Sequence, residues 1–236
     1  MYYNPFFYYM DSTYLLVLIG AILSIWASAR VKATYSKYSH VRCASGMTGA
    51  EAAEKILRMS GIYDVGIEQV SGDLTDHYDS RRKMIRLSDR VYGSASVAAI
   101  GVAAHECGHA IQDQKDYLPL RVRTTLVPAA NIGSRLGIPI ILLGLIFSAF
   151  SGLITIGIWV FAISVLFQIV TLPVEFNASR RALAVLESGG ILGTGELDNA
   201  GRVLRAAALT YVAAAAASIL QLLRLILLFG GGRRRD

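Results

Sequence analysis

The sequence has little charge, almost no cysteine and no internal repeat. Its two cysteines, Cys43 and Cys107, give no disulfide framework. Only 17% of the residues are charged and 54% are hydrophobic, a balance too apolar for an ordinary soluble domain. The net charge is +6, but the basic residues form no recognition stripe, so we expect no nucleic acid partner. What remains is a membrane protein with a modest polar part.

Uncharged runs mark the candidate membrane segments. Residues 14–29 carry no charge and, with their flanks, are long enough for one transmembrane helix. Six aromatic residues within 1–10 suit an interfacial anchor, and the absence of a basic region there argues against a cleavable signal peptide. Arg30 and Lys32 follow the run directly, which predicts an outside N-terminus and a cytoplasmic segment from residue 30 onward.

A second run, residues 136–172, contains no Asp, Glu, Lys or Arg. It is long enough for two short membrane helices in a hairpin that turns at Ser151 and Gly152, with both ends on the cytoplasmic side. Residues 206–229 are apolar enough for a further crossing, which would leave the terminal arginines outside, against the charge rule. The alternative is a helix buried in the protein or lying along the inner surface.

The polar segment, residues 31–135, has the pattern of mixed α and β structure. A capping box at Thr48 and Glu51 predicts the start of a helix that Gly61 ends. Residues 66–70 and 83–87 alternate in polarity and predict two short strands.

His105, Glu106 and His109 form an HExxH motif after a run of small apolar residues at 94–104. The run predicts a buried helix, with serines available as N-caps. On a helix, positions i and i+4 share a face, so the two histidines can hold one metal ion together. Glu106 can deprotonate a metal-bound water, as in zinc metallopeptidases; two core histidines that happen to fall four apart are the alternative. Cys107 is expected to pack as a small hydrophobe.

A catalytic zinc site usually has three protein ligands and a water. The HExxHxxGxxH solution is excluded here, because neither the glycine nor the third histidine follows. Downstream glutamates are the candidates, and Glu175 is favoured over Glu187 and Glu196 because it follows the uncharged hairpin within three residues. A carboxylate there is costly unless a metal or cation pairs with it, and an ion pair with Arg180 or Arg181 is the alternative.

Further candidates surround this set. His77 could be a ligand, a transition-state hydrogen-bond donor or a loop residue, and His40 is expected to have no catalytic role. Tyr211 is a candidate oxyanion donor, with a plain packing role as the alternative. We expect the strand at 83–87 to form the sheet edge that pairs with substrate; an internal strand is the alternative.

Four stretches carry a resemblance to a known family: SVAAIGVAAHECGHAIQ, DHYDSRRKMIRLS, PVEFNASRRAL and ALTYVAAA. They resemble the YugP-type membrane zinc metallopeptidases of bacteria, a neutral zinc metallopeptidase family that is gluzincin-like, over nearly the whole chain. More distantly, the plan is similar to the HtpX heat-shock protease and the type-I CaaX prenyl protease, whose third ligand begins a Glu-x-x-x-Asp pattern. Here Ser179 stands four residues after Glu175, and a hydroxyl orients a ligating histidine less strongly than a carboxylate does.

The resemblance implies a multi-pass α-helical membrane protein with a small α+β zincin-like catalytic domain. We divide the chain into five segments. Residues 1–30 are an N-terminal transmembrane anchor, and residues 31–135 are a cytosolic α+β segment with the HExxH helix. Residues 136–172 form a transmembrane helical hairpin, residues 173–205 a third-ligand helix with its loop, and residues 206–236 a C-terminal apolar helix with a basic tail.

The predicted function is zinc-dependent endopeptidase activity at the cytosolic face of the cell membrane. One Zn²⁺ is expected at His105, His109 and Glu175, with Glu106 as general base and Tyr211 as a second catalytic group. The expected partners are a peptide or protein substrate and the lipid bilayer, and a homo-oligomer or a membrane protein partner stays open. The alternative is a non-catalytic zinc-containing membrane scaffold or regulatory partner.

Overall fold

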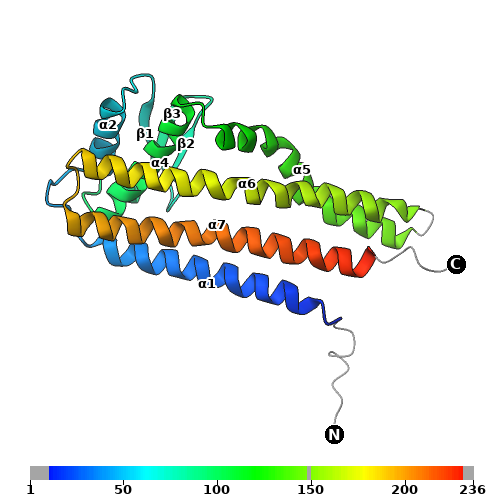
Figure 1. The fold of residues 1–236 in the computed structure, drawn as a ribbon. Helices are drawn as coiled ribbons and strands as arrows, with labels where there is room; N and C mark the ends of the chain where they lie inside the picture. Colours follow the sequence, from blue (N-terminus) through cyan, green and yellow to red (C-terminus); the bar gives the residue numbers. More distant parts are fainter. Residues whose placement is uncertain (1–10, 148–149, 231–236) are drawn as a thin grey trace, which may run out of the picture. The chain divides into compact units, whose positions relative to one another are not determined.

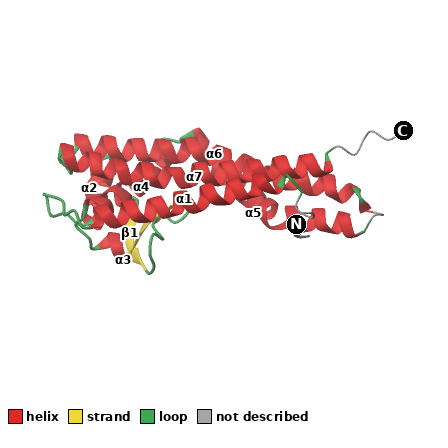
Figure 2. Cartoon of the chain, turned by 90° about the horizontal axis from the view of Figure 1, so that it is seen from below, coloured by secondary structure: helices red, strands yellow, loops and turns green. Residues whose placement is uncertain are grey.

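The computed structural model describes residues 11–147 and 150–230 of the chain (Figure 1). The predicted aromatic anchor at residues 1–10 lies outside the described residues. The fold is mostly helical, with one small sheet of three strands (Figure 2). In chain order the elements are α1 (Tyr14–Ser39), α2 (Gly49–Met59), β1 (Gly66–Val70), β2 (His77–Asp79), β3 (Met84–Ser88), α3 (Asp89–Tyr92), α4 (Val97–Gln114), α5 (Leu118–Ile146), α6 (Gly152–Ser188) and α7 (Thr194–Phe229).

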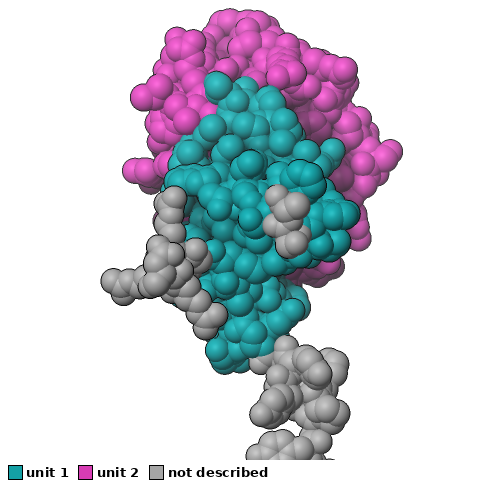
Figure 3. All heavy atoms as spheres, turned by 90° about the vertical axis from the view of Figure 1, so that its right-hand side faces the viewer, with its two compact units in different colours: residues 1–26, 123–170, 211–236 teal, residues 27–122, 171–210 magenta. Residues whose placement is uncertain are grey.

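The chain forms two compact units, which Figure 3 shows in different colours. Unit 1 contains residues 1–26, 123–170 and 211–236, and unit 2 contains residues 27–122 and 171–210. Several long helices contribute residues to both units.

Within the described residues, four helices, α1, α5, α6 and α7, are long and apolar enough to cross a membrane. The most apolar window of each is only 11% to 28% buried within the described protein. Large apolar side chains therefore point outward, among them Ile25 at 70% exposure and Trp159 at 71%. Such surfaces suit lipid, which confirms the prediction of a multi-pass helical protein.

Small residues let the helices of unit 1 approach closely. A side chain at Gly20 of α1 would lie 3.0 Å from the Ala217 backbone of α7, and one at Gly137 of α5 would lie 2.8 Å from Phe161 of α6. Close backbone contact at glycine is typical of helix pairs in membranes. There the hydrophobic effect does not hold helices together, and van der Waals packing does so instead.

Arg224 and two prolines interrupt the apolar helices of unit 1. Arg224 in α7 lies over the ring of Tyr14 at the start of α1, with its guanidinium carbon 4.1 Å from the ring centroid. In α5, Pro128 and Pro139 stand inside the helix, which membrane helices tolerate because neighbouring groups satisfy the freed backbone. Crossing by residues 206–229 stays a prediction that the length of α7 supports.

The predicted hairpin is confirmed at its turn. Helix α5 ends at Ile146 and α6 begins at Gly152, so the break falls where the Ser151-Gly152 pair predicts it. Helix α5 begins at Leu118, so the segment boundary that we drew between residues 135 and 136 lies inside a helix.

In unit 2, α2 begins with the predicted capping box. The Thr48 side chain accepts from the Glu51 backbone, and the Glu51 carboxylate accepts from the Thr48 backbone at 2.8 Å. Gly61 follows the helix with φ +70°, a left-handed value that favours glycine.

The sheet of unit 2 has the strand order β1-β3-β2. Strand β3 pairs in parallel with β1 and antiparallel with β2. The two predicted strands are confirmed, but the expectation that the second one forms the sheet edge is wrong. The missed strand β2, only three residues long, covers that side of β3. Ile85 and Leu87 of β3 are fully buried, and Arg86, between them, pairs with Glu68 and Asp79 on the neighbouring strands.

The core of unit 2 lies where α2 and the sheet pack on α4. Ile56 of α2, Ile85 of β3 and Ile100 of α4 are fully buried in it, together with Leu186 of α6. Alanines on α2 and α4 keep these helices close, which leaves α4 enclosed in the interior. A helix so enclosed is a rigid support for a metal site.

Candidate metal centre

Helix α4 carries the HExxH residues. Ser96 caps its first turn, where its side chain accepts from the Ala99 backbone at 3.2 Å. The helix then runs unbroken to Gln114, so His105 and His109 point to one side. Their ring centroids lie 4.8 Å apart with ring planes at 83°.

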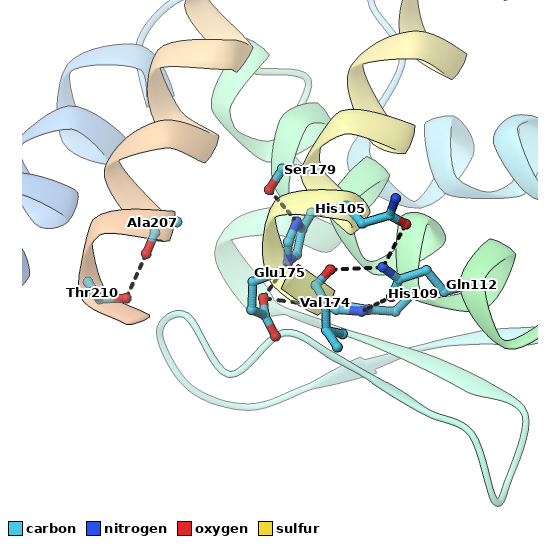
Figure 4. A network of polar contacts seen from close by, with 9 residues as sticks. His105, His109, Gln112, Val174, Glu175, Ser179, Ala207 and Thr210 are labelled. Atoms are coloured by element: carbon cyan, nitrogen blue, oxygen red, sulfur yellow. Dashed lines mark hydrogen bonds and ion pairs between the residues drawn. The ribbon is translucent and has the colours of Figure 1, made fainter. Parts of the chain in front are cut away.

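Glycine in the motif lets α6 approach α4. A side chain carbon at Gly108 would lie 3.0 Å from the carbonyl carbon of Ala178 and closer still to its oxygen. The two helix backbones are therefore in contact at this point. Because Glu175 lies three residues before Ala178, this contact brings the carboxylate of α6 to the histidines of α4 (Figure 4).

The three side chains meet in one cluster. Oε2 of Glu175 lies 3.2 Å from Nε2 of His105 and 3.6 Å from Nε2 of His109. Zinc bonds of about 2.0–2.1 Å in tetrahedral geometry require ligand atoms to lie about 3.3 Å apart, so the donor set fits this ion in type and spacing. Among the described residues, this is the only group of three metal-binding side chains so close together.

The other nitrogen of each ring has a partner. Nδ1 of His105 lies 3.1 Å from Oγ of Ser179, and Nδ1 of His109 lies 3.0 Å from Oε1 of Gln112. Both rings thus present Nε2 toward Glu175, as ligating histidines do when a polar neighbour holds their second nitrogen. Ser179 stands where the sequence comparison with Glu-x-x-x-Asp places a partner. Sequence reasoning missed Gln112, although its spacing three residues after His109 on one helix could have indicated it.

Glu106 is buried at 7% exposure beside this cluster. Burial raises the pKa of its carboxyl to about 7, and the nearby charges of Glu175 and Asp76 act in the same direction. The charge of His105 and a hydrogen bond from the Tyr78 backbone in β2 act against that rise. A pKa near neutrality suits a group that accepts and returns a proton.

Strand β2 is held to α4 by side chains. The Tyr78 hydroxyl donates to Oδ2 of Asp113 at 2.8 Å, and Nζ of Lys83 donates to the same oxygen at 2.7 Å. These bonds keep the edge strand of the sheet against the helix that carries Glu106. Sequence reasoning missed this strand, because three residues give no readable alternation.

The remaining candidates lie outside the cluster. Glu196 caps the start of α7, where its two oxygens accept from the Ala44 and Gly193 backbones at 2.6 and 2.8 Å. Glu187 is exposed near the end of α6, and Nδ1 of the exposed His77 contacts the Thr75 carbonyl oxygen at 2.8 Å.

Three further residues complete the set of sequence candidates. Tyr211 lies half-buried on α7 in unit 1, and its catalytic role stays a prediction. His40 contacts the Ser36 carbonyl oxygen at the end of α1. Cys107 is fully buried within the core, as the sequence predicts.

The model of a known protein family matches residues 13–230 of this chain. The family is described as "Putative neutral zinc metallopeptidase". The chain belongs to this family. Among curated proteins, "Putative membrane protease YugP" of Bacillus subtilis (strain 168) is 46% identical over 201 residues, which cover 85% of this chain and 89% of the relative. No solved structure matches the chain. Family membership and the four apolar helices together make this chain a membrane protein of a zinc metallopeptidase family.

Proposed function

We propose that this protein is a zinc-dependent endopeptidase that hydrolyses peptide bonds at the cytosolic face of the cell membrane. The proposal rests on the arrangement of four side chains, three that can bind one metal ion and one that lies beside them. Three of them, His105, His109 and Glu175, converge their ligand atoms. The fourth, Glu106, is a buried carboxylate beside them that is not needed as a ligand. A purely structural zinc site has no use for such a group.

One Zn²⁺ held by the three ligands would supply a Lewis acid that polarises the scissile carbonyl and makes a water molecule acidic. Glu106 takes a proton from that water while the oxygen of the water bonds to the carbonyl carbon. It then delivers the proton to the amide nitrogen as the carbon–nitrogen bond breaks, so the amine leaves neutral.

The fold around the site would be zincin-like, with a small sheet beside the metal helix. Strand β2 lies at the sheet edge, and its Tyr78 backbone reaches Glu106. An extended peptide is the substrate class that such an edge recognises, because backbone hydrogen bonds ignore side-chain sequence. Tyr211 and His77 are the candidates for the oxyanion donor.

The proposed orientation rests on charge. Lysines and arginines follow the first apolar run and flank the hairpin, which favours a cytoplasmic position for residues 31–135 and 173–205. The substrate would be a peptide or protein that reaches this face of the bilayer. Nucleic acid is not an expected partner, and a homo-oligomer or a membrane protein partner remains compatible with the proposal.

Comparing the peptides of three cell populations tests this function in the cell. One population carries the intact protein, the second carries Glu106→Gln, and the third carries Glu187→Gln as the matched exposed control. We expect cleavage products that are absent only from the Glu106→Gln cells. Identical peptides in all three populations would favour the non-catalytic zinc scaffold instead.

A further inference from the structure

A fully buried amide side chain, Gln112, joins α4 to α6 beside the metal centre. Its oxygen Oε1 lies 3.0 Å from Nδ1 of His109 on the same helix. Its nitrogen Nε2 donates to the Val174 carbonyl oxygen at 2.8 Å, as Figure 4 shows, and to Oδ1 of Asn177 at 3.0 Å. A buried polar side chain with every group paired is held in one orientation.

The chemistry of the neighbours fixes which way this amide faces. Nε of Arg181 lies 2.7 Å from the Asn177 side chain, and a guanidinium can only donate hydrogen bonds. The Asn177 atom between them must therefore be the oxygen, which can only accept. Gln112 must present its NH₂ group to that oxygen, and the same NH₂ group meets the Val174 carbonyl, a second acceptor.

The orientation of Gln112 in turn decides the proton on His109. With its NH₂ group committed to α6, Gln112 offers only the acceptor Oε1 to Nδ1 of His109. A lone pair on Nδ1 would face a lone pair on Oε1, so Nδ1 must carry the hydrogen. The neutral ring then has its free lone pair on Nε2, which is the nitrogen that faces Glu175 at 3.6 Å.

We infer that Arg181 is a positioning residue which, through Asn177 and Gln112, holds the proton of His109 on Nδ1 and so reserves Nε2 for the metal. This inference rests on the proposed function only in taking His109 as a zinc ligand. With the hydrogen held on Nδ1, Nε2 is the ring nitrogen that is left to bind an ion.

The first member of the relay is itself anchored. The guanidinium carbon of Arg181 lies 5.9 Å from the ring centroid of Tyr117, just after α4. The Tyr117 backbone donates to the Gln112 carbonyl oxygen at 3.0 Å. Tyr117, just after α4, therefore contacts both the Arg181 guanidinium and the backbone of Gln112.

In the described part of the protein, no comparable chain of hydrogen bonds fixes the proton of His105 through its Nδ1. Nδ1 of His105 contacts the hydroxyl of Ser179, and a hydroxyl can either donate or accept. The contact orients the His105 ring but does not select its tautomer. Ser179→Ala is thus a matched control that removes a ring partner without touching the relay.

Substitutions at position 177 separate the relay from packing. Asn177→Asp keeps an acceptor for both Arg181 and Gln112, whereas Asn177→Leu has a similar size and offers none. In zinc-free protein, the ¹⁵N spectrum of the histidine rings reports which nitrogen of His109 is protonated, and chelator competition gives the zinc dissociation constant. We expect the Asp variant to match wild type. The Leu variant should populate both tautomers of His109 and bind zinc about 10- to 100-fold more weakly.

Gln112→Met removes the acceptor itself and should weaken zinc binding at least as much as Asn177→Leu. Ser179→Ala should leave the His109 proton on Nδ1. Equal spectra and zinc affinities for the Asp and Leu variants would overturn the inference, as would a Leu variant that disturbs both histidines equally. These readouts need no substrate. A wild-type protein that shows the relay but cleaves no peptide would contradict the proposed function alone.

Discussion

Gly108→Ala is expected to separate Glu175 from the histidines. The new carbon would lie 3.0 Å from the Ala178 carbonyl carbon, where relaxed carbon contacts are about 3.5–4.0 Å. Helix α6 must therefore move by about 0.5–1 Å at this point. A displacement near 1 Å can cost about 100-fold in rate when it misplaces a group at a reacting centre. We expect a similar loss in peptide cleavage and at least a tenfold loss in zinc affinity.

Gly101→Ala is the matched control in the same helix. A side chain carbon there would lie 3.4 Å from the Ala200 side chain, an ordinary contact. Both substitutions replace a helical glycine with alanine, and this replacement by itself stabilises a helix by about 1 kcal/mol. Overpacking costs about 1–3 kcal/mol, so Gly108→Ala should unfold at a lower temperature than Gly101→Ala.

Chelator competition, peptide cleavage and thermal unfolding of the two detergent-purified variants measure these differences. A Gly108→Ala protein that binds zinc and cleaves peptides as the Gly101→Ala protein does would refute the proposed role of the α4–α6 contact.

Two further predictions concern the ligand set and the topology. Glu175→Ala should lose stoichiometric zinc and the stabilisation that a bound metal gives, whereas Glu187→Ala should keep both; zinc analysis and the chelator response of the unfolding temperature decide this. Zinc retained by Glu175→Ala would exclude that carboxylate as the third ligand. With the native cysteines replaced, an impermeant thiol reagent applied to intact cells should label a cysteine placed at Ser151 but not one placed at Ser71. Labelling at Ser71 from outside would reverse the proposed orientation.

Local signals account for what the sequence predicted of the fold. The capping box at Thr48 and Glu51, the alternation at residues 66–70 and the turn at Ser151 each depend on neighbours within a few residues. Such patterns specify an element wherever it finally packs. The helix that carries His105 is of the same kind, because its apolar run and N-cap are contiguous.

Non-local contacts account for what the sequence did not predict. Strand β2 is too short to show alternation and exists because β3 pairs with it, so the central position of β3 was hidden as well. The contact of Gln112 with Asn177 joins residues 65 positions apart. The spacing of HExxH indicated both histidines, but the carboxylate that meets them could be chosen only by its place after the membrane hairpin. The structure brings Glu175 to this place through the close approach at Gly108.

The rate of peptide cleavage per bound zinc, measured for purified wild type and Glu106→Gln, tests the central claim most directly. Glu106 lies beside the three proposed ligands without being one of them, so the substitution should leave zinc content unchanged. Loss of a general acid and base typically slows a reaction about 10²- to 10⁴-fold, and we expect a loss in this range, with Glu187→Gln unaffected. A zinc-loaded Glu106→Gln protein that cleaves peptides at the wild-type rate would contradict the proposed peptidase mechanism.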